Sequence, residues 1–370
     1  MAHIVKVGDL LINDVNDNNL YDSGVDTVGD VIGQPLSPQQ QATKLAEVLK
    51  SLKVSSWRGL PLGQAGDYLN YLSQAEILAP YGAVEMTSQN LNLAIDSVQG
   101  TTIPFDTKRA DAAYQTALTQ AVDLNFAEAE KIAKEGGSID EAKNYLSSAA
   151  TYVAELQQSF HSKIFFDMRR ADAAMIEAYQ KGIPNIYMQA LREAAKGNID
   201  AAKSDLQAVQ GHIAEANRQF NLGLNYDRGQ GDFIMKLAYI IGIASYYPFA
   251  QSFASKGLTQ STRTTLLKIQ TLIAEANQNY NLGLTYDQAR ADGIMEVALV
   301  KGIEDNFQYA ARLAKKGDVA NARHWLTQAE NYTNEYNRKF GHLNGRTPLV
   351  FDQIRADLIL DCALGKKSCP

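Results

Sequence analysis

The amino-acid sequence predicts an all-α fold, a repeat array of helical hairpins forming a solenoid or an elongated bundle, preceded by a short N-terminal arm. Three observations carry this prediction. A motif returns about every 60 residues, apolar residues recur three and four apart, and glycines follow basic residues at fixed positions. The chain has 370 residues, of which 45% are apolar, so it is long enough for such an array and unlike disordered proteins.

The N-terminal arm, residues 1–36, is rich in oxygen-bearing side chains. Their spacing is that of an EF-hand loop, in which position 7 contributes a backbone carbonyl. Positions 1, 3, 5, 7, 9 and 13 of such a loop fall on Asp14, Asn16, Asn18, Leu20, Asp22 and Asp26. Because Ca²⁺ takes six to eight hard oxygen ligands, the segment predicts a calcium site, with Asp26 in place of the usual bidentate acid.

Two positions of this loop depart from the EF-hand pattern. Position 6 is Asn19 instead of glycine, although asparagine tolerates the left-handed turn. Position 12 is Val25, which has no side-chain ligand. The alternative interpretation is an Asx-rich surface turn without a metal.

Residues 7–32 resemble the calcium loops of secreted bacterial proteins, namely the B-type repeats of Gram-positive surface adhesins and, more loosely, dockerin modules. The resemblance implies an extracellular or cell-surface protein. It also implies that Ca²⁺ binds through Asp14, Asn16, Asn18, Leu20 and Asp22.

Residues 37–104 are expected to form an atypical helical cap. Ser37 followed by Pro38 is typical of a helix start, and apolar spacing predicts a helix over residues 39–53. Residues 54–104 lack the repeat motif, which fits a terminal unit that must differ from its neighbours to stay soluble. Leu10 to Ile12 are expected to form a short strand before the loop.

Residues 105–361 hold four helical repeats. They are marked by the motif aromatic-Asp-x-x-(Arg/Gln)-(Ala/Gly)-Asp, which occurs once per repeat and once more at the end. The five copies are residues 105–111, 166–172, 226–232, 286–292 and 351–357. We expect the first Asp of each copy to cap or begin a helix. The last nine residues, 362–370, are expected to form a C-terminal tail.

Glycines divide each repeat. One set lies near the middle of each repeat and in three repeats directly follows a lysine, a pattern that predicts a helix end with a left-handed glycine. The set is Gly136, Gly197, Gly257 and Gly317. Another set lies midway between the first motif Asp and that glycine, and Pro184 follows its first member: Gly182, Gly242 and Gly302. Each repeat is therefore expected to be an antiparallel hairpin whose second arm is broken or kinked.

The charged residues of the motif allow two interpretations. A ladder of ion pairs and helix caps would fix one repeat onto the next, whereas a row of carboxylates would bind a ligand. The structural interpretation is favoured because the copies occur in every repeat. The third copy differs, with Gln230 in place of arginine and with Gly229 and Gly231 beside it.

Several classes of function are excluded or disfavoured. A net charge of −6 argues against sequence-independent nucleic-acid binding, and no apolar run of about 18 residues predicts a membrane span. No metal-site spacing involves the five histidines, and no catalytic motif occurs, so the protein is not expected to be an enzyme. A disulfide and two free thiols are both open for Cys362 and Cys369.

These observations predict a secreted or cell-surface, calcium-binding structural or adhesion protein that acts through contacts with a protein partner or with itself. A self-assembling layer or filament is one form of this function. The alternative is a helical scaffold that binds a small molecule or glycan. Tyrosines that could stack on glycans are instead expected mainly in packing: Tyr239, Tyr246, Tyr247, Tyr280 and Tyr286.

Overall fold

The computed structural model describes residues 3–21, 26–30, 34, 36–342 and 347–368. The chain forms two compact units. Unit 1 comprises Met1–Ile183 with Phe220–Leu222, and unit 2 comprises Pro184–Gln219 with Gly223–Pro370. The boundary falls inside one long helix, α6 (Met168–Ala195).

Unit 1 begins with an antiparallel sheet of three strands in the order β1 (His3–Val7), β2 (Leu10–Asp14) and β3 (Thr27–Asp30). The strand expected at Leu10 to Ile12 is therefore confirmed. In the register of the sheet, Ile12 pairs with Val5 on one side and with Val28 on the other. Because successive side chains alternate between faces, one face of the sheet is apolar and buried, and it carries Val7, Leu10, Ile12 and Val28.

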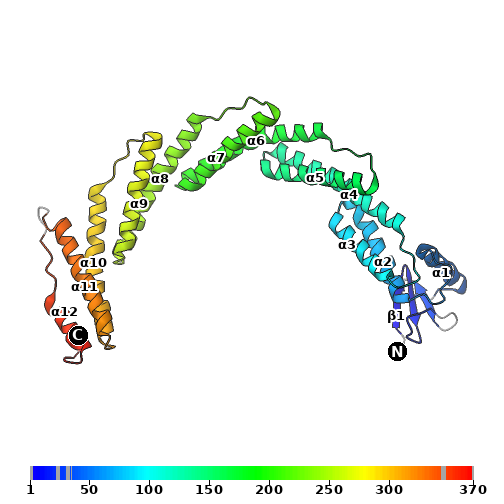
Figure 1. Ribbon diagram of the computed structural model, residues 1–370, viewed down its shortest axis with the longest axis horizontal. Coiled ribbons are helices and arrows are strands. Elements are labelled where there is room, and N and C mark those ends of the chain that lie inside the picture. Colours follow the sequence, from blue (N-terminus) through cyan, green and yellow to red (C-terminus); the bar gives the residue numbers. More distant parts are fainter. Residues whose placement is uncertain (1–2, 22–25, 31–33, 35, 343–346, 369–370) are drawn as a thin grey trace. The chain divides into compact units, whose positions relative to one another are not determined.

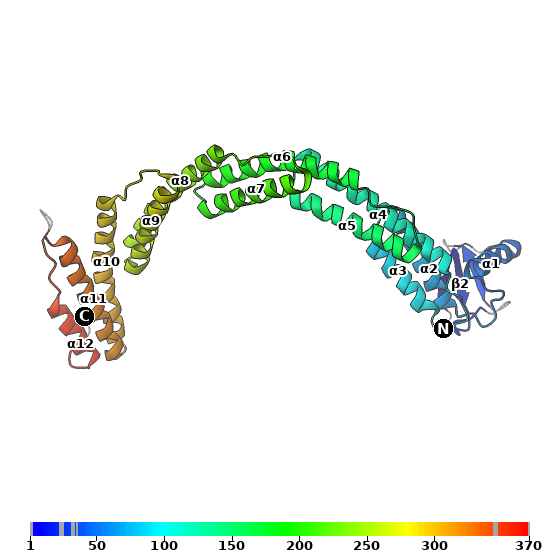
Figure 2. The same cartoon turned by 45° about the horizontal axis from the view of Figure 1, so that its top comes forward.

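Three helices share a hydrophobic core with this sheet: α1 (Pro38–Leu52), α2 (Leu62–Leu78) and α3 (Val84–Val98). The short 3-10 turn η1 (Ala79–Tyr81) lies between α2 and α3 in the chain. Figure 2 shows the strands beside α1 and α2. Gly66 of α2 lies against β1, where a Cβ atom would collide with the carbonyl oxygen of Lys6. Leu52 and Leu62 are buried in the same cluster as Ile12, so one hydrophobic core crosses the boundary expected at residue 36.

The repeats form helical hairpins. In unit 1, α4 (Thr107–Glu135) and α5 (Ile139–Phe160) lie side by side (Figure 1). In unit 2, α8 (Arg228–Ser255) pairs with α9 (Thr259–Tyr280), and α10 (Gln288–Ala314) pairs with α11 (Val319–Phe340). Between them in the chain, α6 is followed by α7 (Ile199–Phe220). The described chain is thus the all-α helical array that the periodicity predicts, with one small sheet.

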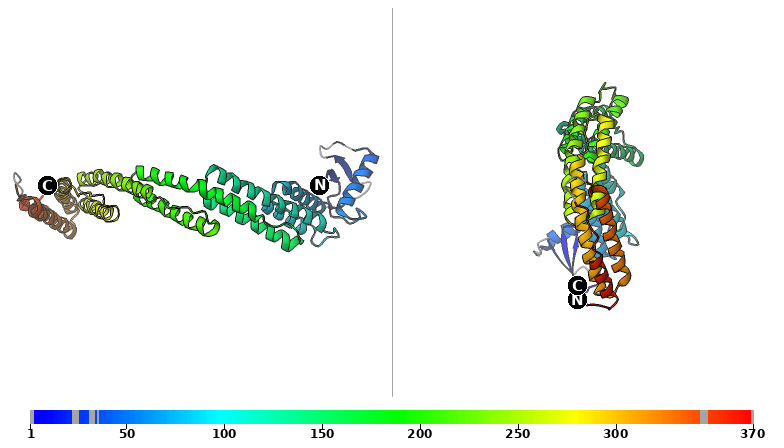
Figure 3. Two further views of the ribbon diagram at one scale, coloured as in Figure 1. Left: turned by 90° about the horizontal axis from the view of Figure 1, so that it is seen from above. Right: turned by 90° about the vertical axis from the view of Figure 1, so that its left-hand side faces the viewer.

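The last helix, α12 (Gln353–Ala363), packs against α10 and α11. Figure 3 shows these three helices together in orange to red. Phe307, Leu326 and Ile359 are buried in their shared core. The helix includes Cys362, so α12 extends into the segment that was expected to be a tail.

The predicted helix ends are confirmed. Gly136, Gly197, Gly257 and Gly317 all have φ between 67° and 74°, the left-handed conformation that glycine adopts without steric cost. At helix starts, the side chain of Ser138 accepts from the backbone N–H of Glu141. Ser37 forms a capping box with Gln40 at the start of α1.

The prediction of a break midway along one arm of each hairpin was wrong. The glycines concerned lie in the first helix of each hairpin, and α6, α8 and α10 run unbroken through them. Each contacts the start of the previous hairpin's second helix: a Cβ on Gly182 would lie 2.7 Å from Cγ1 of Ile139, and one on Gly242 would lie 2.8 Å from the carbonyl oxygen of Gly197. These glycines therefore allow hairpins to pack closely.

Helix α8 is the one helix in the described part of the chain that is long and apolar enough to cross a membrane. In its most apolar 18-residue window, 44% of the residues are buried within the protein. Ala238, Tyr239 and Ala250 are each no more than 1% exposed. The apolar character of α8 is thus used in part for packing within unit 2.

Candidate functional site

The loop after β2 begins at a buried carboxylate. Asp14 is fully buried, and its two oxygens accept hydrogen bonds from the backbone N–H groups of Asn18 and Asn19 at 3.3 and 2.6 Å. Asp26, at 8% exposure, accepts from the N–H of Val15 at 2.9 Å. Val15 follows Asp14 directly, so the Asp26 carboxylate is hydrogen-bonded to the residue next to the one that bears the Asp14 carboxylate.

The loop is fixed to the start of α2 by Asn19. Its carbonyl oxygen accepts from the N–H of Leu62 at 2.8 Å, and its Oδ1 accepts from the N–H of Gly63 at 2.7 Å. Leu20 also forms an isolated β-bridge with Pro61. Asn19 has φ 58°, so it adopts the left-handed conformation that position 6 of an EF-hand loop requires.

The structure brings some of the predicted metal ligands together. Asp26 is hydrogen-bonded to the residue that follows Asp14, while the side-chain oxygen of Asn18 accepts from the N–H of Leu20 at 2.8 Å. Asn16 lies exposed on the loop, and Asp22 lies outside the described residues. Within the described residues, no group of three or more His, Cys, Asp or Glu side chains could hold a metal ion.

The donor types of the loop nevertheless fit a hard divalent cation. The loop carries two carboxylates with little solvent exposure together with amide and backbone oxygens, which are the ligand types that Ca²⁺ takes. Oxygens that already accept one hydrogen bond keep a second lone pair for a cation. Asp14, Asn16, Asn18, Leu20 and Asp26 are the described residues that would supply ligands.

A second set of built contacts recurs where one hairpin meets the next. In all five motif copies, the first Asp caps the helix that follows, and its Oδ1 accepts from the N–H of the residue three positions later at 2.8 to 3.3 Å. The predicted capping role is therefore confirmed. Three of the Asp backbone N–H groups also donate to a tyrosine hydroxyl of the preceding hairpin or cap; the tyrosines are Tyr68, Tyr187 and Tyr247.

The motif arginine joins the same junction. Arg109, Arg170 and Arg355 form ion pairs with Glu76, Glu130 and Glu304, with shortest N–O distances of 2.6 to 2.7 Å. The guanidinium groups of Arg170, Arg290 and Arg355 also lie over aromatic rings, 4.4 to 4.7 Å from the centroid. The ladder of caps and ion pairs favoured from the sequence is thus present.

The third copy has a local reason for its glycine. Tyr226 lies over Gly231, where a Cβ atom would collide with the tyrosine hydroxyl. The fourth copy has Ala291 at the equivalent position, with Tyr286 as its aromatic residue. The glycine at this position therefore allows a closer approach of the ring to the helix.

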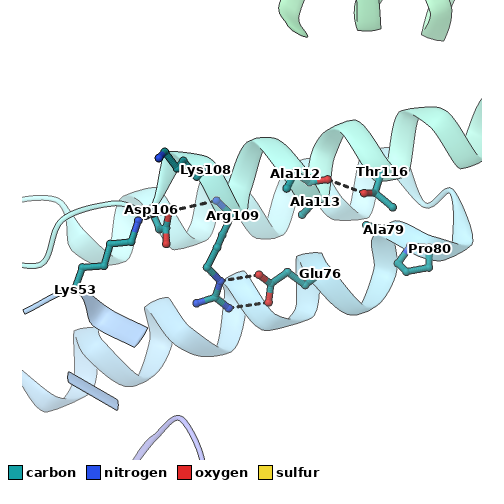
Figure 4. Close-up of a pocket in the computed structure, with 10 residues that line it drawn as sticks. All are labelled: Lys53, Glu76, Ala79, Pro80, Asp106, Lys108, Arg109, Ala112, Ala113 and Thr116. Carbon is teal, nitrogen blue, oxygen red and sulfur yellow. Dashed lines mark hydrogen bonds and ion pairs between the residues drawn. The ribbon is translucent and has the colours of Figure 1, made fainter. Parts of the chain in front are cut away.

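A cavity of about 520 Å³ lies in unit 1 at the first junction (Figure 4). Figure 4 shows Arg109 reaching from α4 to Glu76 on α2, and Lys53 reaching to Asp106. Burial would raise the pKa of Asp106, but hydrogen bonds from Lys53 and from the N–H of Arg109 outweigh it and hold the pKa below its usual value. Both acids of this cavity are thus engaged in holding the junction.

The partners of the motif were not identified from the sequence. The glutamates that receive the arginines have no constant spacing, because they lie 33, 40 and 51 residues before their partners. The tyrosines gave a usable signal, since Tyr187 and Tyr247 both lie 40 residues before the Asp that they contact.

No family model, no curated protein and no solved structure matches this chain.

Proposed function

We propose that this is a secreted or cell-surface, calcium-binding structural or adhesion protein that acts through protein–protein contacts. The observation that carries the calcium part is that Asp14 and Asp26 are both buried and both accept hydrogen bonds from the backbone of one loop, which is fixed to α2. Burying a carboxylate costs free energy that hydrogen bonds, ion pairs or a metal ion must offset, and a bound divalent cation would contribute to this for both groups. The cation would order the loop against the core of unit 1.

The structural role is supported by the hairpin junctions. The first Asp of each motif copy caps the helix that follows, and motif arginines contact neighbouring helices, as Asp287 does for α10 and Arg355 does for α12. The extracellular location is supported by Cys362, which is disulfide-bonded. Cys369 is the only other cysteine of the chain and lies outside the described residues. Disulfides persist mainly in oxidising compartments.

Calorimetric titration of the metal-stripped full chain with Ca²⁺ tests the proposal. We expect one Ca²⁺ per chain in the wild type, and at least tenfold weaker binding in Asp14→Asn and in Asp26→Asn. Asp67→Asn, at an exposed position of α2, serves as the control and should bind as the wild type does. An absence of heat in the wild type, or equal binding in all variants, would reject the calcium site.

Sedimentation velocity with and without Ca²⁺ tests the structural role separately. We expect concentration-dependent association that Ca²⁺ strengthens. A monodisperse monomer at high concentration that does not respond to Ca²⁺ would count against self-assembly.

A further inference from the structure

Two cavities in unit 2 have equivalent linings one repeat apart. The first, of about 260 Å³, lies between α7 and the start of α8; the second, of about 300 Å³, lies between α9 and the start of α10. Nine lining positions correspond, each displaced by one repeat, and six of them keep the same residue or the same charge. These six are Lys203/Arg263, Leu206/Leu266, Gln210/Gln270, Tyr226/Tyr286, Asp232/Asp292 and Met235/Met295.

The cavities combine an apolar floor with a polar rim. Leu206 and Met235 are 5% and 2% exposed, and Leu266 and Met295 are 5% and 6% exposed. The rim is formed by a half-buried tyrosine, a glutamine amide and the second Asp of the motif. The polar groups therefore include donors and acceptors within a small volume above an apolar surface.

The basic residues of the rim are neutralised by neighbouring acids. Lys203 pairs with Glu275 at 3.4 Å, and Arg263 forms two hydrogen bonds with Glu335 at 2.8 and 2.9 Å. A strongly anionic ligand would compete with these glutamates. Each lining also holds one carboxylate together with one further cation, Asp232 with Arg228 in the first cavity and Asp292 with Lys339 in the second, so neither cavity presents a single sign of charge. The charges therefore favour a neutral ligand.

We propose that these two cavities bind saccharide units of a neutral glycan. A pyranose ring has an apolar face that fits against tyrosine and aliphatic side chains, and its vicinal hydroxyls both donate and accept hydrogen bonds. The Asp232 and Asp292 carboxylates accept from hydroxyls, while the Gln210 and Gln270 amides donate and accept. Volumes of about 260 and 300 Å³ lie at the lower end of the range for small-ligand pockets, which suits a single sugar ring.

The repetition of the cavity supports a polymeric glycan as its ligand. Equivalent sites on one chain let a second sugar unit bind intramolecularly once the first is bound, so weak single sites can retain a glycan. The inference does not depend on Ca²⁺, because neither cavity includes a residue of the N-terminal loop.

The test titrates the full chain with chitopentaose, cellopentaose and mannopentaose, using calorimetry and saturation-transfer NMR, in the presence and absence of Ca²⁺. We expect at least one of the three to bind, and the double variant Asp232→Asn/Asp292→Asn to bind it at least tenfold more weakly. Asp357→Asn is the matched control, because Asp357 occupies the same motif position in the last copy and lines neither cavity.

A second pair of variants keeps the test independent of folding. Gln210→Ala and Gln270→Ala change exposed side chains and should each weaken binding, with circular dichroism showing an unchanged helix content. The proposal is overturned if none of the three sugars binds at millimolar concentration, or if the double variant binds as Asp357→Asn does. Binding of a pentalysine peptide in place of the sugars would also overturn it, since that result would assign the cavities to a protein partner.

Discussion

Arg355 at the start of α12 forms a two-pronged ion pair with Glu304 of α10, in which Nη1 and Nη2 lie 2.7 and 2.9 Å from the two carboxylate oxygens. The same guanidinium group lies over the ring of Phe307 at 4.7 Å. This geometry fixes the last helix onto the hairpin before it. It also makes the stability of that junction dependent on pH.

Glu304→Gln should lower the stability of unit 2 at neutral pH but have little effect near pH 2. The hydrogen bond from Arg355 lowers the pKa of Glu304 from 4.5 to about 2, so the folded state favours the ionised form. Its contribution is therefore present above pH 4.5 and is lost as the pH falls toward 2. The pair is partly exposed, so we expect a loss of only about 0.5 to 1 kcal/mol.

Chemical denaturation of this variant between pH 2 and 7 measures the effect. Glu330→Gln, at an exposed position of α11, is the control and should show the pH dependence of the wild type. A loss of stability in Glu304→Gln that is the same at both ends of the range would contradict the role of the ion pair.

Removing one tyrosine hydroxyl should weaken a junction without disrupting it. In Tyr247→Phe, the backbone N–H of Asp287 loses the oxygen that accepts it at 3.2 Å. We expect a loss of about 1 kcal/mol in the free energy of unfolding, which is the usual contribution of one hydrogen bond. The ring packing should persist, because Phe126 and Phe307 contact the motif aromatic at other junctions without a hydroxyl. Tyr246→Phe, which leaves this contact intact, should be close to neutral; equal losses in the two variants would refute the assignment.

Two glycine-to-alanine substitutions in neighbouring helices should have opposite effects. Gly242→Ala places a Cβ atom 2.8 Å from the carbonyl oxygen of Gly197, so it should destabilise the protein by about 1 to 3 kcal/mol. Gly293→Ala in α10 meets no atom within 4 Å and should stabilise it by about 0.5 to 1 kcal/mol through helix propensity. Thermal unfolding of both variants measures the two effects. A shift of the melting temperature with the same sign in both would be inconsistent with close packing at Gly242.

Asn277 should control the order of the segment between hairpins. Its side chain donates to the carbonyl of Leu284 at 2.7 Å and accepts from the N–H of the same residue at 2.8 Å. In Asn277→Ala, we expect hydrogen exchange at the Leu284 amide to accelerate by about tenfold, as a loss of about 1 to 2 kcal/mol implies. Asn279→Ala, at an exposed position nearby, should leave this exchange rate unchanged. Protection that survives in Asn277→Ala would show that the segment is held by other contacts.

The sequence alone predicted the helical hairpins because their signals are local. Apolar spacing, the left-handed glycine at Gly197 and the cap at Asp287 each depend on residues within a few positions along the chain. The same locality explains the error at Gly242. A glycine inside a helix can mark either a break or a close approach, and the difference depends on Gly197, which belongs to the turn of the preceding hairpin.

The sequence alone was sufficient to predict the repeat, its helical form and the helix ends. Tertiary structure alone decided which glutamates receive the motif arginines, that the sheet and the cap share one core, and that two equivalent cavities recur in unit 2. The physical reason is that these features depend on side chains brought together from distant positions. Packing selects such partners by shape and charge, and the glutamates in particular keep no fixed spacing from their arginines.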